Sequence, residues 1–125
     1  MDKLNEAFKI LRKSGFIAKQ NFQCCNSCAG YAIASHVNDK ITKKQEYKRK
    51  IRGAVFYNRQ DTARMKKYGK LYINYGPIGT TGHGVVGETY EAIGSAITTV
   101  LTACNLKWEW SGNPDERILV IDPGE

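Results

Sequence analysis

Three of the four cysteines in the sequence lie close together, at Cys24, Cys25 and Cys28. Thiolates are ligands for soft divalent metals such as zinc, so this cluster predicts a candidate metal site. Cys25 and Cys28 also have the C-x-x-C spacing of a thiol–disulfide redox pair. A third interpretation is that these small side chains only pack as apolar groups at the junction between a strand and a helix. The residues leave all three interpretations open.

The metal and the redox interpretations each lack a feature that such sites usually have. A closed structural zinc site has four ligands, and the chain contains no second C-x-x-C. The residues that could supply the fourth ligand are all distant in sequence: His36, His83 and Cys104. A thioredoxin-like site usually has Gly-Pro or a similar pair between its cysteines, whereas Asn26 and Ser27 occupy those positions here. Cys104 falls on the apolar stripe of a predicted helix, which indicates a core position.

A basic segment is the second feature that could do chemistry: the stretch from Lys40 to Arg52 carries +6 of the net charge of +7. It can bind nucleic acid or another polyanion, or it can be a solvated loop that keeps the protein soluble. Tyr47 lies among the charges, where its ring could stack on a base. If all seven basic side chains met phosphates, binding would depend on salt with a logarithmic slope of about −6. The candidate anion-binding residues are Lys43, Lys44, Tyr47, Lys48, Arg49, Lys50 and Arg52.

The glycine-rich segment 79–84 (GTTGHG) lies between a predicted strand and a predicted helix. A loop in that place can bind phosphate at the helix N-terminus. The segment lacks the G-x-G-x-x-G order and the G-K-[ST] ending of known phosphate-binding motifs, so a flexible turn is the favoured interpretation. No catalytic constellation can be assembled, because no spacing links the usual acid–base groups, which are His36, Asp61, His83 and Glu88.

Helices and strands that alternate along the chain must position these residues. Apolar residues recur at helical spacing from Leu4 to Leu11 and from Ile93 to Cys104. The predicted helices cover about 3–13, 26–37, 61–67 and 93–104, and the predicted strands cover 16–23, 53–57, 71–75, 106–110 and 117–121. Asn26 or Ser27 is expected to cap the second helix, and Asn105 to end the last one. This order predicts an α+β fold: a mixed sheet of about five strands, helices packed on it, and a C-terminal β-hairpin.

Length and composition predict a single domain over 1–125 with a basic insertion at about 38–52. No stretch approaches the roughly 20 apolar residues that span a membrane. The N-terminus lacks the apolar region of a signal peptide. A cytoplasmic location without a membrane partner is therefore expected, and in that reducing compartment the cysteines are expected to be thiols or metal ligands.

Segments along the chain resemble the motifs of a family of uncharacterised bacterial domains. Segment 21–28 (NFQCCNSC) is similar to its N-F-x-C-C-x-S-C motif. Segments 55–62 and 71–76 are similar to V-Y/F-F/Y-H-x-Q-D-T and L-x-L-x-Y-G, and segment 108–118 to W-x-W/D-G-x-P-x-x-R-I. Asn58 stands where this family often has histidine, which argues against a catalytic or metal role at that position. The resemblance implies no activity, because the family has no established function.

These observations favour a non-catalytic binding module for an anionic partner: nucleic acid, a nucleotide or an acidic protein surface. The alternative is a zinc-binding or thiol-redox protein that uses Cys24, Cys25 and Cys28. Catalysis is not expected, and zinc is the one cofactor that the residues suggest. For a small basic protein of an obscure family, a phage-encoded inhibitor of a host system is a further hypothesis.

Overall fold

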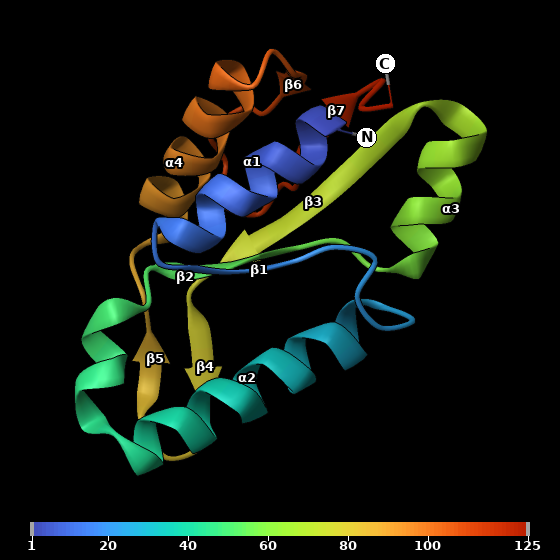
Figure 1. Cartoon of the computed structure of the whole chain (residues 1–125). Helices are drawn as coiled ribbons and strands as arrows, with labels where there is room; N and C mark the ends of the chain where they lie inside the picture. The colour runs from blue at the N-terminus through green and yellow to red at the C-terminus, as the bar shows by residue number, and fades with distance from the viewer. Residues whose placement is uncertain (1, 125) are drawn as a thin grey trace.

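The structure of the protein, a computed structural model, describes residues 2–124 (Figure 1). In chain order the elements are α1 (Asp2–Lys13), β1 (Phe16–Lys19), α2 (Asn26–Lys43), the 3-10 helix η1 (Gln45–Lys50), β2 (Gly53–Phe56), α3 (Arg59–Tyr68), β3 (Lys70–Gly76), β4 (Ile78–Thr80), β5 (Gly84–Val86), α4 (Tyr90–Ala103), β6 (Lys107–Glu109) and β7 (Ile118–Ile121). Within residues 2–124, no helix has both the length and the apolar character that a membrane crossing requires.

Five strands form a mixed sheet in the order β1-β2-β3-β7-β6. β1 and β2 pair in parallel, and the other neighbours pair antiparallel. β6 and β7 form the C-terminal hairpin, with Trp108 opposite Val120. The predicted α+β class, the mixed five-stranded sheet and the closing hairpin are therefore confirmed.

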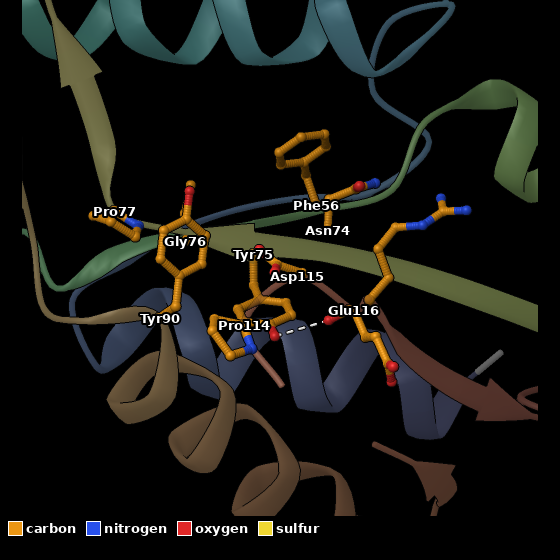
Figure 2. Close-up of a pocket in the computed structure, with 11 residues that line it drawn as sticks. Phe56, Asn74, Tyr75, Gly76, Pro77, Tyr90, Pro114, Asp115 and Glu116 are labelled. Atoms are coloured by element: carbon orange, nitrogen blue, oxygen red, sulfur yellow. Dashed lines mark hydrogen bonds between the residues drawn. The ribbon is translucent and has the colours of Figure 1, made fainter. Parts of the chain in front are cut away.

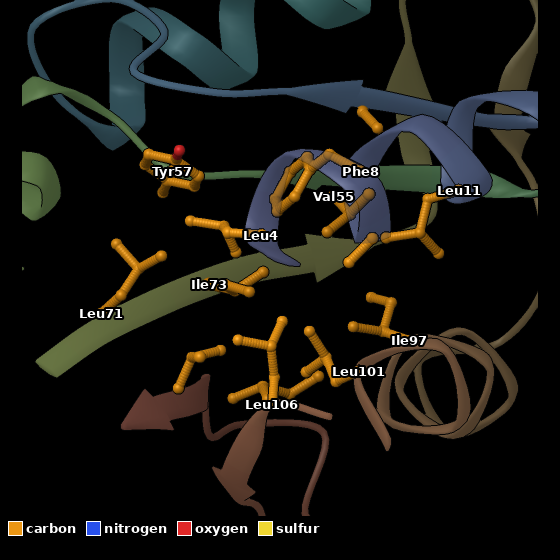
Figure 3. Packing of buried hydrophobic residues seen from close by; sticks show 14 of the residues in the cluster. Leu4, Phe8, Leu11, Val55, Tyr57, Leu71, Ile73, Ile97, Leu101 and Leu106 are labelled. Carbon is orange, nitrogen blue, oxygen red and sulfur yellow. The ribbon is translucent and has the colours of Figure 1, made fainter. Parts of the chain in front are cut away.

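The larger hydrophobic core lies between one face of the sheet and the two helices α1 and α4 (Figures 1 and 3). The apolar stripe of α1 faces the sheet, and the ring of Phe8 meets that of Tyr57 edge-on at a centroid distance of 5.4 Å. Each fully buried large apolar side chain stabilises the fold by about 1.5–3 kcal/mol. The buried side chains of the two helices include Leu4, Ala7, Phe8, Leu11, Ile93, Ile97 and Leu101.

A smaller core lies on the opposite face of the sheet, where α2 packs (Figure 1). Ile33, Val37 and Ile41 are buried at intervals of four residues along α2 and pack with Ala54 of β2. Because this stripe extends to Ile41, α2 continues to Lys43 and does not end near residue 37 as predicted. Most of the basic segment is therefore regular structure, formed by the last turn of α2 and by η1.

Two predictions about the segment before α2 are wrong. β1 ends at Lys19, short of the predicted end at residue 23. Asn21 and Gln23 have φ angles of 51° and 64°, which turn the chain out of the extended conformation. The N-cap of α2 is Cys25, whose side chain makes no capping hydrogen bond, so neither Asn26 nor Ser27 has that role. The chain therefore turns sharply just where the cysteines begin.

The glycine-rich segment 79–84 forms a hairpin and not a loop before a helix. β4 and β5 pair antiparallel, and the amide of Gly82 at the tip donates to Oδ1 of Asn38 in α2 at 2.9 Å. α4 begins later, with Thr89 as its N-cap. The hairpin points toward α2 and away from α4 (Figure 1), so the phosphate-binding arrangement considered from the sequence does not form.

Gly94, in the middle of α4, allows close packing of Trp110. A Cβ at this position would overlap the indole ring. We expect Gly94→Ala to lower the free energy of unfolding by about 1–3 kcal/mol, because the cost of overpacking exceeds the gain in helix propensity. Urea denaturation would measure this loss. Gly30→Ala is the matched control, since no atom lies within 4 Å of a Cβ there; an equal loss in both variants would contradict the packing role.

Candidate functional site

The cysteine cluster lies in the loop after β1 and in the first turn of α2. Two backbone hydrogen bonds hold this loop. The Phe22 amide donates to the Tyr57 carbonyl at 2.9 Å, and the Arg59 amide donates to the Gln23 carbonyl at 3.0 Å. Both bonds join the loop to the connection between β2 and α3. The cysteines are thus held at the N-terminus of α2, where the partial positive charge of the helix favours thiolates.

The structure brings the three sulfur atoms together. The Sγ of Cys24 lies 3.7 Å from that of Cys25 and 3.5 Å from that of Cys28. All three atoms lie within 4.8 Å of one another. Sulfurs at about 2.3 Å from a tetrahedral zinc are about 3.8 Å apart, so this spacing requires little change to accept the ion. Cys24 and Cys28 are exposed and Cys25 is half-buried, so an ion can reach the sulfurs from solvent.

The packing of the cluster shifts the pKa values of Cys25 and Cys28 in opposite directions. The Cys28 backbone amide, followed by the Cys28 and Cys24 side chains, lowers the pKa of Cys25 by hydrogen bonding to its sulfur. The same neighbours act in the opposite sense on Cys28, where hydrogen bonding to the Cys24 and Cys25 side chains raises the pKa to about 11. Of Cys25 and Cys28, the first to lose its proton is therefore Cys25, at the helix N-cap, and the resulting thiolate disfavours a second one at Cys28. A metal cation would reverse that effect, because its charge stabilises all three thiolates.

The structure does not bring any of the suggested fourth ligands to the cluster. His36 is eight residues beyond Cys28 on the same helix, about 12 Å along its axis. His83 Nε2 lies 2.9 Å from Thr42 Oγ1, near the other end of α2. Cys104 caps the C-terminus of α4, which packs on the other face of the sheet. Within residues 2–124, the grouped metal-ligating side chains are the three cysteines alone.

A polar network fixes the first turn of α2 beside the cysteines. Asn58, which is 2% exposed, donates through Nδ2 to Oδ1 of Asn26 at 2.5 Å, and Asn74 donates to the same oxygen at 3.1 Å. Asn58 and Asp61 also form the capping box of α3, each accepting a hydrogen bond from the other's backbone amide. The buried carboxylate of Asp61 pairs with Arg117 at 3.3 Å. Because Asn26 directly follows the cysteine pair, this network holds the backbone of the candidate site.

From the sequence, Asn58 has no predicted structural role and α3 is predicted to begin at Asp61, whereas α3 begins at Arg59. One signal was available, because Asn58 and Asp61 have the spacing of a capping box. The bond from Asn58 to Asn26 had no such signal. It joins residues far apart in the sequence, and only the pairing of β1 with β2 brings them together.

A pocket of about 260 Å³ lies between the end of β3 and segment 114–117 (Figure 2). The Tyr75 hydroxyl donates to the Glu116 carbonyl at 2.8 Å, which holds this segment against β3, and burial raises the pKa of that hydroxyl. Two of the lining residues, Asn74 and Arg117, belong to the polar network beside the cysteines. The lining offers amide, guanidinium, hydroxyl and carboxylate groups, but no histidine or cysteine among its residues.

The predicted anion-binding residues gather around the C-terminal end of α2. Lys43 is the last residue of α2, and Lys44 is both its C-cap and the N-cap of η1. Arg52 lies between η1 and β2. The remaining four lie within η1: Tyr47, Lys48, Arg49 and Lys50. The end of α2, η1 and the residues just after it therefore collect the side chains of the predicted basic insertion.

Two of these side chains already have partners in the fold. Arg52 forms an ion pair with Glu88, with 2.7 Å between Nε and Oε2, and its guanidinium lies 4.6 Å from the centroid of the Phe16 ring. Lys48 Nζ donates to the His83 carbonyl at 2.9 Å, joining η1 to the β4–β5 hairpin. These intramolecular contacts account for the positions of the Arg52 and Lys48 side chains, so no anionic ligand is needed to explain them.

A family model described as a domain of unknown function (DUF6891) matches residues 1–123. No curated protein and no solved structure matches the chain. The matched range includes the cysteine cluster, the polar network and the C-terminal hairpin. The resemblance to an uncharacterised domain family is therefore confirmed at the level of the whole domain.

Proposed function

This chain belongs to the DUF6891 family, a domain of unknown function, and we propose that it binds zinc through Cys24, Cys25 and Cys28. The observation that carries the proposal is the convergence of three sulfur atoms within 4.8 Å. Thiolates are soft ligands, which favour zinc over magnesium, calcium or manganese. The chain supplies three ligands, and the fourth coordination position is open to water or to a group from another molecule.

The bound zinc is not needed to build the fold. Hydrophobic clusters on both faces of the sheet are formed without any contribution from the three cysteines. Zinc fingers differ in this respect, because they are unfolded without their metal. A surface site with three protein ligands resembles the zinc sites that exchange their fourth ligand. The metal in this protein therefore serves contact with an external ligand and not stability.

Disulfide exchange is the second candidate function, and the 3.5 Å between the Sγ atoms of Cys24 and Cys28 favours it. This pair differs from the C-x-x-C pair of Cys25 and Cys28 that the sequence suggested. A disulfide uses two sulfurs and leaves the third without a role, whereas a metal uses all three. Metal binding therefore explains the convergence of all three sulfur atoms, whereas a disulfide explains that of two.

Elemental analysis of protein purified without a chelator tests the proposal. We expect about one zinc per chain, and we expect cobalt substitution to give the thiolate-to-metal charge-transfer absorption of sulfur ligands. Cys104→Ser is the control and should retain the metal, because Cys104 lies apart from the cluster. Absence of zinc together with four free thiols would refute the proposal. A Cys24–Cys28 disulfide found by mass spectrometry would support the exchange function instead.

A further inference from the structure

We propose that the exposed side of α2 and η1 binds single-stranded nucleic acid, with lysines contacting the phosphates and Tyr31 stacking on a base. The central feature is a groove of about 440 Å³ lined by His36, Asp39, Lys40, Lys43, Lys44 and Tyr47, called here the basic groove. It lies toward the opposite end of α2 from the cysteines. α2 has 18 residues and is about 27 Å long, so this proposal and the zinc proposal can be tested separately.

The cations of this surface have no acidic partners in the fold. The ion pairs within residues 2–124 are Arg52 with Glu88 and Arg117 with Asp61. Lys48 is held by the His83 carbonyl, and the basic side chains near the groove that make neither a hydrogen bond nor an ion pair within residues 2–124 are Lys40, Lys43, Lys44, Arg49 and Lys50. Part of this charge complements the dipole at the C-terminus of α2. Five positive charges exceed the partial negative charge at one helix C-terminus. Their combined electrostatic field attracts a polyanion.

The cations stand on a rigid support. Val37 and Ile41, on the inner side of α2, are fully buried. Tyr47 is half-buried against the smaller core, and Lys40 Nζ lies 5.0 Å from the centroid of its ring. Lys48 joins η1 to the β4–β5 hairpin through the His83 carbonyl. Because the backbone of this surface is fixed, a ligand pays little for ordering it. Because the ring of Tyr47 packs against the smaller core, it is not free to stack on a base as the sequence suggested. Another aromatic residue must do so.

Tyr31 is the residue suited to stacking. It is 78% exposed, a high value for a tyrosine on a helix, and it lines a second hollow of about 270 Å³ with Asn38 and Thr81. Asp39 lines both this hollow and the basic groove, so the two adjoin at that residue. Proteins that bind single strands without sequence preference combine a basic groove with exposed aromatic rings in this way. Stacking between successive base pairs covers the base faces that Tyr31 needs, so a duplex fits this surface less well.

A nucleic acid fits this surface better than an acidic protein does. Protein interfaces are depleted in lysine and carry a central apolar patch. The exposed large apolar and tyrosine side chains of residues 2–124 are Tyr31, Tyr68, Tyr72, Val85 and Tyr90, and none of them lies in the basic groove. Repeated lysines without an apolar centre suit the evenly spaced charges of a phosphodiester chain.

The structure also changes the expected salt dependence. Five free cations on a single strand give a logarithmic slope of about −3.5, shallower than the value of about −6 expected if all seven basic residues met a duplex. Fluorescence anisotropy with an oligo-dT probe at several salt concentrations measures this slope. In Lys40→Glu, Lys43→Glu, Lys44→Glu, we expect the slope to fall to about −1.5 and the affinity to fall at least about tenfold. The corresponding glutamine variant tests the same contacts if charge reversal impairs folding.

Three further variants make the test specific. Lys9→Glu, Lys13→Glu, Lys107→Glu changes the net charge equally at exposed positions elsewhere and should bind like the wild type. Tyr31→Ala should weaken binding about 5- to 100-fold without changing the salt slope. Asp39→Asn removes the one carboxylate that lines the basic groove and should strengthen binding, by up to about fivefold.

The proposal fails under any of three results. Equal loss of binding in the control triple variant would show that net charge alone attracts the probe. Competition by polyglutamate as strong as that by oligo-dT would indicate an acidic protein partner. Duplex DNA bound as tightly as the single strand, or Tyr31→Ala bound as tightly as wild type, would remove the stacking role.

Discussion

Replacing Cys28 with serine is expected to lower the affinity for zinc by at least about 100-fold while leaving the fold intact. Loss of a residue that merely positions a metal ligand costs 10- to 100-fold in affinity, and loss of the ligand itself costs more. A serine hydroxyl has the same size but is not deprotonated near neutral pH, so it is a poor substitute for a thiolate. Competition with a zinc-binding dye measures the change.

The fold is expected to survive this change because Cys28 is exposed. Circular dichroism and urea denaturation of the metal-free Cys28→Ser protein should match those of metal-free wild type within about 0.5 kcal/mol, the usual size of a surface substitution. Cys104→Ser provides the comparison, since it removes a thiol from another part of the fold and should leave zinc affinity unchanged. Wild-type affinity in Cys28→Ser would exclude the three-sulfur site.

Asn58→Ala is expected to lower the free energy of unfolding by about 2–3 kcal/mol. Its side chain caps α3, which is worth about 1 kcal/mol, and it donates the short hydrogen bond to Asn26. The lost cap bond is the one that the Asp61 amide donates to Asn58 Oδ1, and the loss of the second bond leaves Oδ1 of Asn26 with Asn74 as its remaining donor. Thermal or urea denaturation of the metal-free protein measures this effect.

The same substitution is expected to weaken zinc binding about tenfold, because it frees the first turn of α2 beside the cysteines. Asn58→Ser separates the two effects. Serine is also a good N-cap, so stability should fall by only about 1 kcal/mol, but its side chain is too short to reach Asn26. A double-mutant cycle with Asn26→Ala should give a coupling energy of at least about 0.5 kcal/mol. Additive losses would mean that Asn58 acts on α3 alone.

Periodicity predicts the elements of this fold whose packing is regular. The stripe from Leu4 to Leu11 was sufficient to place α1 on the sheet, and the stripe beginning at Ile93 was sufficient for α4. The length of α2 was underestimated because its basic last turn obscures the single apolar position at Ile41. The β4–β5 hairpin was missed because its stability depends on α2, through contacts such as Gly82 with Asn38, and not on its own sequence.

The candidate site was predictable in composition but not in geometry. The spacing of Cys24, Cys25 and Cys28 identified the three cysteines of the candidate site. The loop turn that makes their sulfurs converge depends on positive φ angles that no residue type there requires. The basic segment was recognised by charge alone. Which of its cations are free depends on Glu88 and the His83 carbonyl, which are distant in sequence.

The position of β7 in the sheet has a consequence for how the chain is made. β7 is the last strand in sequence, yet it lies between β3 and β6. A ribosome that adds about 5–20 residues per second needs roughly 2–9 seconds to proceed from the end of β3 to the end of β7. During that interval the edge of β3 has no partner, and α1 has only part of the surface on which it packs. The nascent domain therefore cannot complete its sheet gradually. Until β7 is available, the edge of β3 that β7 covers is unpaired, and an unpaired edge can join a strand of another chain.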